Sequence, residues 1–509
     1  MRVWLFALLL FTLAFVLRLW NLNMMGRTWD EPNIVEKGYD FVQLARHLDF
    51  TNKFWYDSPD HPPLSNYLYG IASVGDFERF DKHVTISFQS SPYGAGIFHY
   101  DLTFSRLISV FFSSLAVVLV FLIGARYLSL FVGIVAGIVL AMMPHFLGYS
   151  QLVTHESLIT CFFTASAFSY LLYFEKRTKL LLIISGVLTG MTLELKQSNI
   201  LLFALLFGLF LLWKYIHPKE RNVNLYHMIS LSMIAVATYI LLWPMPLFHL
   251  PEFINFTYVM WFKNNGMVPQ LIFGVYKGAT KTFYLKAFFV TTPVLILCLV
   301  GIGVWTSIRR NNWIGYAILL WFLVPFLTSF FHERQMMVRY IIEFYAPIAL
   351  LAAIGLEFLI NKFTQKQSIR YLAAGLLAAY LLLILVQISP YYLDYYNELV
   401  GGTGSVYKHK LFFLGEWGQG LRNPGKYVAD HASKGSIIGL ALNPLSTLFQ
   451  SPSLKYEQFN THRIYAYVIV NTYNDFRIGF DENILQKDYT AVYAEKADGA
   501  VLARVYKHR

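Results

Sequence analysis

Residues 103–123 read TFSRLISVFFSSLAVVLVFLI, an apolar run whose one formally charged residue, Arg106, stands near its start. A helix of about 20 such residues crosses the roughly 30 Å hydrocarbon core of a bilayer. Ten further apolar runs of similar length bring the prediction to about eleven membrane-spanning helices; they lie near 3–20, 129–147, 155–174, 179–195, 200–216, 227–248, 286–307, 313–331, 340–360 and 371–388. The fold class predicted from this pattern is a polytopic, all-α membrane protein.

Composition and charge agree with this class. Hydrophobic residues make up 56% of the 509 residues and charged residues 14%, against roughly 25% charged in soluble domains. The net charge of +11 does not indicate a nucleic-acid partner, because much of it lies in short links such as Lys176-Arg177 and Arg309-Arg310. Positive charge in short loops marks the cytoplasmic side and favours anionic membrane lipids.

This charge pattern predicts a multi-pass protein of the cell membrane with a cytoplasmic N-terminus. The first run ends in Arg18-Leu19-Trp20-Asn21 rather than in a small-residue cleavage site, so it is interpreted as an uncleaved anchor. The loop 21–101 and everything after residue 389 then lie outside. Arg106, close to the outer end of its run, is expected to anchor the helix at the membrane interface.

Two domains are predicted, a transmembrane domain over residues 1–388 and an extracytoplasmic domain over 389–509. The second is expected to be a small α/β domain, since a helical pattern at 423–433 precedes strand-like stretches at 436–442, 464–470 and 489–494. The last strand is predicted to pair with 500–506 across Asp498-Gly499, a strong hairpin signal.

The first external loop carries an amphipathic helical pattern. Ile34, Phe41, Leu44 and Leu48 recur near helical spacing, with charged residues between them, which favours a helix lying in the plane of the interface. The prolines that follow His61 do not fit a regular helix and predict a stiff turn.

Acids and cations gather at the outer ends of the predicted spans. They include Asp30, Glu31, Glu156, Lys196 and Arg339. An acid beside a hydroxyl can act as a general base, and Lys and Arg hold phosphate. This combination at the outer leaflet predicts transfer of a group from a lipid phosphate to an acceptor.

Short motifs in sequential order carry a resemblance to a known family. They are Asp30-Glu31, Gly38-Tyr39-Asp40, His61-Pro62-Pro63-Leu64, Thr154-His155-Glu156, Leu195-Lys196, Arg339-Tyr340 with Pro347, and Gly401-Gly402 with Gly415-Glu416-Trp417-Gly418-Gln419-Gly420-Leu421. Together they resemble the GT-C glycosyltransferases of the protein O-mannosyltransferase type, to which the bacterial aminoarabinose transferases are also similar. Glu156 stands where that family more usually has Asp.

The resemblance implies a GT-C fold and a mannosyltransferase-like hexosyltransferase. The enzyme would move a sugar from a polyprenyl-phosphate donor, with inversion, to a protein, lipid or glycan acceptor outside the cytoplasm. Asp30 matches the catalytic base, and Glu31 is its catalytic neighbour. Residues predicted to bind substrate are His61, Glu156, Lys196 and Arg339, with the last two meeting the charge of the leaving phosphate.

Alternative interpretations stay open at this point. Glu31 would also fit a role in orienting its loop, and the glycines around Trp417 fit a tight turn as well as a sugar-binding segment. No cofactor is assigned and no metal ligands are predicted, although a divalent cation held by His145, His155, Glu156 and Asp30 is one alternative. A transporter or lipid flippase is the rival class, and a catalytically degenerate GT-C scaffold is another.

Overall fold

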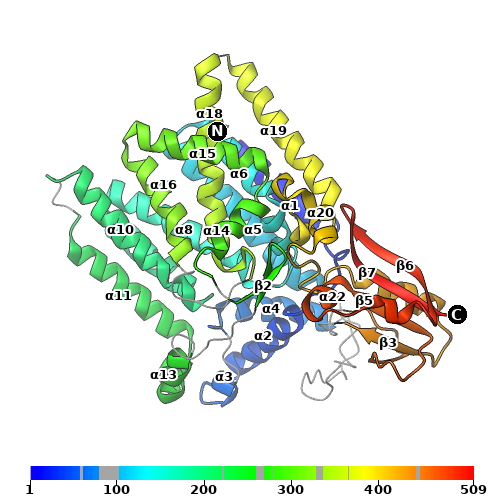
Figure 1. The fold of residues 1–509 in the computed structure, drawn as a ribbon. Helices are drawn as coiled ribbons and strands as arrows, with labels where there is room; N and C mark the ends of the chain where they lie inside the picture. Colours follow the sequence, from blue (N-terminus) through cyan, green and yellow to red (C-terminus); the bar gives the residue numbers. More distant parts are fainter. Residues whose placement is uncertain are drawn as a thin grey trace.

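The structure, a computed structural model, describes residues 2–57, 61–78, 102–219, 223–259, 269–278, 280–327, 336–364, 366–442 and 448–509. A large helical part is followed by a carboxy-terminal part with a five-stranded sheet (Figure 1). The predicted order of apolar helices followed by an α/β region is therefore present.

Within these ranges, seven helices are long and apolar enough to cross a membrane. These are α1 (Arg2–Leu19), α5 (Thr103–Tyr127), α8 (His155–Lys176), η1 (Gln197–Ile200) with α10 (Leu201–Ile216), α11 (Leu225–Leu242), η4 (Arg339–Phe344) with α18 (Tyr345–Phe363), and α19 (Gln367–Ile388). The count rises to nine if two bent pairs each form one span. The described residues thus support a multi-pass membrane protein.

The prediction of eleven spans is not confirmed, although a helix occurs at every predicted apolar run. The pair α6 (Leu130–Met142) and α7 (Pro144–Ser150) is bent by 64°, and the pair α14 (Phe283–Thr291) and α15 (Val294–Arg310) by 118°. Pro144 and Pro293 lie at these breaks, where proline removes a helical hydrogen bond. Two further helical segments are shorter, namely α9 (Lys179–Leu193) and α16 (Trp313–Leu323) with η3 (Val324–Leu327).

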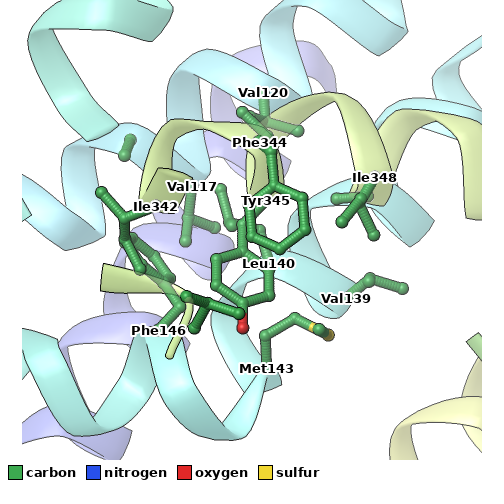
Figure 2. Close-up of a cluster of buried hydrophobic side chains, with 14 of the residues drawn as sticks. Val117, Val120, Val139, Leu140, Met143, Phe146, Ile342, Phe344, Tyr345 and Ile348 are labelled. Atoms are coloured by element: carbon green, nitrogen blue, oxygen red, sulfur yellow. The ribbon is translucent and has the colours of Figure 1, made fainter. Parts of the chain in front are cut away.

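The core of the helical part lies where α5, α6, α7 and the start of α18 meet. Figure 2 shows Val117 and Val120 near Phe344 and Tyr345, with Leu140 beside Tyr345. All five side chains are fully buried. Burial of large apolar side chains stabilises by about 1.5–3 kcal/mol each in water, and in a membrane their close packing has the same role of fixing the helix positions.

Helices α15 and α18 approach each other most closely at two glycines. A Cβ added to Gly303 would lie 1.9 Å from the Leu351 carbonyl oxygen, and one added to Gly355 would lie 2.1 Å from the Leu299 oxygen. Small residues let membrane helices pack backbone against backbone. This contact holds α18, and with it η4, at a fixed position.

The segment between α1 and α5 forms α2 (Glu31–Arg46), α3 (Phe54–Asp57) and α4 (Leu64–Glu78). Ile34 and Phe41 of α2 are buried as the amphipathic pattern predicts. Gly38 faces Gly70 of α4 so closely that a Cβ on either residue would meet the other's backbone. Helix α2 is therefore anchored against α4, and Asp30 at its start has a defined position.

Between α11 and α14 lie α12 (Met245–Phe248), α13 (Leu250–Tyr258) and a hairpin of β1 (Gln270–Ile272) and β2 (Val275–Lys277). After α19 come η5 (Tyr392–Asp394), η6 (Glu398–Val400), α20 (Gly402–His409) and α21 (Arg422–His431). The β1–β2 hairpin contacts the segment after α20 through a backbone hydrogen bond, in which Gly274 N donates to the Leu411 oxygen at 3.0 Å.

The carboxy-terminal sheet has the order β4-β3-β5-β7-β6. Its strands are β3 (Ile437–Ala441), β4 (Lys455–Gln458), β5 (Tyr467–Asn471), β6 (Tyr489–Ala497) and β7 (Ala500–His508), with α22 (Thr472–Ile478) and η8 (Glu482–Leu485) between β5 and β6. β3 pairs in parallel with β4 and β5, and β7 pairs antiparallel with β5 and β6. The predicted hairpin is confirmed, with Asp498 and Gly499 at positive φ in its turn.

Candidate active site

Arg339 is the centre of the candidate site. Its Nη2 lies 2.8 Å from Asp30 Oδ2, and its Nε lies 2.7 Å from Glu156 Oε1. The Arg339 side chain is 7% exposed and Glu156 1%, whereas Asp30 is 30% exposed. The arrangement is a nearly buried cation held between two acids, one of which faces outward.

Three separate elements bring these residues together. Asp30 directly precedes α2, where Pro32 fits the first helical turn. Glu156 lies in the first turn of α8, and Arg339 opens η4 at the start of α18. Because acids are favoured at helix N-termini, the first turns of α2 and α8 are natural positions for carboxylates facing a shared cation.

The second Glu156 oxygen, Oε2, is buried and has no hydrogen-bond partner within the described ranges. A buried acceptor left unpaired costs about 1–3 kcal/mol. A donor supplied by a ligand would remove that cost.

Lys196 lies beside this centre. Its Nζ is 3.8 Å from the centroid of the Tyr340 ring, and the Arg339 guanidinium carbon is 5.7 Å from the same centroid. Lys196 is 9% exposed. The two predicted cations, Lys196 and Arg339, therefore both contact the Tyr340 ring. Neither the composition nor the spacing of the sequence predicts this shared contact.

Two histidines extend the site toward α4. The His61 and His155 rings lie 4.5 Å apart, edge to face. His155 Nδ1 lies 2.6 Å from Oγ of Ser65, the second residue of α4. His61 thus lies beside the first residue of α8, His155, which precedes Glu156 in the chain. Asp60, which precedes it, lies outside the described residues, as do His332, Glu333 and Arg334.

Glu31 lies in a separate, buried network. Its carboxylate accepts from Arg106 Nε and Nη2, both at 2.8 Å, from Thr28 N at 2.8 Å and from Val153 N at 2.9 Å. Glu31 is fully buried. A carboxylate that already accepts four hydrogen bonds has little capacity left for a substrate.

The expectation that Arg106 is an interfacial anchor is wrong. Its side chain is 2% exposed, and besides Glu31 it donates to the Leu22 and Gly26 carbonyl oxygens at 2.8 and 2.5 Å. These contacts tie residues 22–31 to α5. Arg106 is thus the fixed support of the loop that carries Asp30.

A metal centre does not assemble from the described residues, where no group of three His, Cys, Asp or Glu side chains could hold an ion. His145 lies elsewhere, with Nε2 3.0 Å from the Tyr395 oxygen. Asp30 and Glu156 are instead occupied by Arg339. A divalent cation therefore stays a prediction.

Trp417, from the segment after the last span, closes the site. The Arg339 guanidinium carbon is 4.2 Å from the centroid of the Trp417 ring, and Trp29 N donates to the Trp417 oxygen at 3.3 Å. Next to it, burial raises the pKa of Glu416 to about 7, against the opposing effects of a Gln270 hydrogen bond and the charge of Arg339. The glycine-rich segment is a turn, as one interpretation predicts, and it also lies at the site.

The first half of the chain is similar to a known protein family. Residues 8–260 match the family described as dolichyl-phosphate-mannose-protein mannosyltransferase. A comparison with curated protein sequences gives no match. The matched residues include Asp30, Glu31, His61, Glu156 and Lys196, whereas Arg339 and Trp417 lie beyond them.

Among solved structures, ArnT from Cupriavidus metallidurans is similar over nearly the whole chain. In its undecaprenyl phosphate-bound form the TM-score is 0.53 at 13% identity, and in its apo form 0.52 at 13%. Both matches cover 98% of this chain and 97% of ArnT. At this identity the likeness shows a shared fold.

The oligosaccharyltransferase from Archaeoglobus fulgidus is also similar, with a TM-score of 0.49 at 13% identity over 76% of this chain. This chain matches only 55% of that protein's length, so the likeness adds nothing about activity. Taken with the family match, the ArnT fold confirms the resemblance predicted from the sequence: this is a membrane protein of GT-C fold, similar to the transferases of the protein O-mannosyltransferase and aminoarabinose transferase type.

Proposed function

We propose that this protein transfers a sugar from a polyprenyl-phosphate donor to an acceptor hydroxyl outside the cytoplasm. One observation carries the proposal: the outward-facing carboxylate of Asp30 lies 2.8 Å from the buried cation Arg339. A base and a phosphate-binding cation must lie side by side if the acceptor is to attack a sugar while phosphate leaves.

In the proposed reaction the acceptor hydroxyl gives its proton to Asp30 as its oxygen bonds to the anomeric carbon of the sugar. The bond between that carbon and the phosphate oxygen breaks in the same displacement, so the configuration inverts. The electron pair of the broken bond stays on polyprenyl phosphate. Its added negative charge is met by Arg339, with Lys196 nearby, in the way that fixed donors stabilise developing anions.

The other predicted residues receive different roles. Glu31 holds the loop through Arg106 and is proposed as a structural residue rather than a second catalytic acid. Glu156 holds Arg339 through Nε, while Asp30 contacts Nη2. Its unpartnered oxygen would suit a substrate hydroxyl, and His61 would form the wall beside it.

The resemblance favours a hexose, with mannose as the first candidate, and an acceptor that is a protein, a lipid or a glycan. We retain the prediction of a cytoplasmic N-terminus and of an extracytoplasmic domain over residues 389–509. Under this topology the pair of Asp30 and Arg339 faces the outer leaflet, where a polyprenyl-linked donor would be presented.

The test uses the purified chain in lipid vesicles with radiolabelled polyprenyl-phosphate hexoses and a panel of protein, lipid and glycan acceptors. Asp30→Asn removes the base, and because general base catalysis contributes about 10²- to 10⁴-fold, transfer is expected to fall by at least about 10²-fold. The matched control is Glu175→Gln, an exposed acid paired with Arg126 at the other end of α8. Undiminished transfer by Asp30→Asn would reject the proposed base.

A further inference from the structure

The segment Gly415–Gly420 follows the membrane helices in the chain and contacts the candidate site through Trp417. We propose that Trp417 is a positioning residue that holds the guanidinium of Arg339 ready for the leaving phosphate. This inference rests on the proposed function. It makes the carboxy-terminal region part of the transfer site rather than an appended domain.

The guanidinium of Arg339 is restrained along its edges by side chains from the membrane part. Asp30 binds Nη2, Glu156 binds Nε, and Nη1 makes a weak contact of 3.6 Å with the Met336 sulfur. Contacts in the plane leave a flat group free to rotate out of that plane. The Trp417 ring, 4.2 Å from the guanidinium carbon, limits that rotation.

Trp417 is poorly placed to stack on a sugar. Its side chain is buried, at 4% exposure, because the guanidinium lies against the ring and Tyr149 meets it at 5.8 Å, edge to face. A carbohydrate would have to displace one of these partners. The ring therefore acts on the site through Arg339.

The backbone around Trp417 is fixed by a dedicated set of hydrogen bonds. Asp394 Oδ1 accepts from Gly415 N at 2.8 Å and from Gln419 Nε2 at 3.0 Å. Gln419 Oε1 in turn accepts from Trp417 N at 2.8 Å. Together with the Trp29 contact to the Trp417 oxygen, these bonds restrain the residue on both sides.

Glycines make this turn possible. Gly415, Gly418 and Gly420 have φ of +67°, +81° and +86°, values that residues with a Cβ rarely adopt. A Cβ on Gly420 would also lie 2.8 Å from the Leu502 Cβ of β7. The turn that presents Trp417 is thus joined directly to the carboxy-terminal sheet.

The consequence is a preorganised cation. A donor group that is already oriented costs no reorganisation when charge develops on the phosphate. Without the Trp417 ring, Arg339 keeps its ion pairs but loses one restraint on its orientation. Its guanidinium would then stabilise the charge of the leaving phosphate less strongly. A cation–π contact at a desolvated site corresponds to roughly a 3- to 30-fold change in an equilibrium or a rate.

The experiment measures transfer and, independently, equilibrium binding of labelled undecaprenyl phosphate to the full chain in lipid nanodiscs. Trp417→Ala is expected to lower kcat and phosphate affinity by about 3- to 30-fold while leaving the acceptor KM unchanged. Trp417→Phe retains an aromatic face and is expected to restore most of both. Trp305→Ala is the matched control, since Trp305 also lies beside an arginine, Arg309 at 5.2 Å, but is 45% exposed and outside the site.

A double-mutant cycle separates positioning from general support of the fold. In an Arg339→Gln background, Trp417→Ala is expected to change undecaprenyl phosphate affinity less than twofold, because the guanidinium that the ring restrains has gone. An equal loss in both backgrounds, or wild-type affinity and kcat in Trp417→Ala, overturns the inference. Failure of the wild type to bind the lipid and to transfer any sugar would instead reject the proposed function itself.

Discussion

The pair formed by Glu31 and Arg106 allows a structural role to be separated from a catalytic one. We predict that Glu31→Gln lowers the stability of the protein, because the native carboxylate accepts four hydrogen bonds while fully buried. A glutamine of the same shape offers one acceptor oxygen and an NH₂ group, which would face donors. Arg106 would then be a buried cation without a matching charge.

The magnitude follows from the burial of both partners. Breaking a buried ion pair from one side costs about 3–5 kcal/mol. An unfolding entropy of about 2.1 cal/mol/K per residue gives roughly 1 kcal/mol/K if all 509 residues unfold together. The expected fall in Tm is therefore roughly 3–5 °C.

The assay is thermal unfolding of the purified variant in detergent, followed by transfer measurements below its Tm. The control is Glu175→Gln, which removes the same charge from a similar fork of two contacts to Arg126, but on the surface at 44% and 37% exposure. Exposed pairs are worth about 0–1 kcal/mol, so this Tm should change by about 1 °C or less. If Glu31→Gln kept the wild-type Tm but lost transfer, Glu31 would be catalytic and our structural interpretation would be wrong.

Three further predictions concern other parts of the chain. Burial raises the pKa of Asp394 from about 3.8 to about 7, so its stabilising contribution is complete below about pH 4 and is lost as the pH rises toward 7. Wild-type Tm should therefore fall more between pH 5 and 8 than that of Asp394→Asn, and equal slopes would contradict this. Gly303→Ala should lower the free energy of unfolding by more than about 1 kcal/mol, because the added Cβ would overlap the backbone of α18. Gly301→Ala should leave it unchanged, since nothing lies within 4 Å of an added Cβ there. The denaturation midpoints of the two variants test this difference. Lys196→Gln should reduce kcat by roughly 10²-fold without unfolding the protein, and near-normal kcat would remove it from phosphate stabilisation.

The helical architecture could be predicted because hydropathy depends on local sequence. Every predicted apolar run contains a helix, yet the number of complete spans does not follow. Pro144 and Pro293 mark the bends in two pairs, but sequence alone does not say whether a proline kinks a span or divides it. That choice depends on the helices packed around it.

The candidate site could be predicted in part. Placing Asp30, Glu156, Lys196 and Arg339 at outer helix ends is enough to bring them near one another, since such ends share one side of the membrane. Their pairing cannot be deduced in this way. Asp30 and Arg339 are 309 residues apart, and their distance depends on how the loop before α2 and the start of η4 are held by the helices around them.

The roles of Arg106 and Trp417 could not be predicted from the sequence, for a physical reason. An arginine near the end of an apolar run fits an exposed anchor and a buried partner equally well, and the choice for Arg106 depends on Glu31, 75 residues away. The glycines around Trp417 predict a turn correctly, but their spacing carries no information about the cation beneath the ring.

The order in which the site residues occur along the chain has a consequence for biosynthesis. Asp30 and Glu156 enter the membrane early, Arg339 much later, and Trp417 only when most of the polypeptide has left the ribosome. A partly translated chain therefore holds its acids without the cation that the proposed reaction needs, and it would not consume donor lipid. Translation itself would thus delay activity until the enzyme is nearly whole.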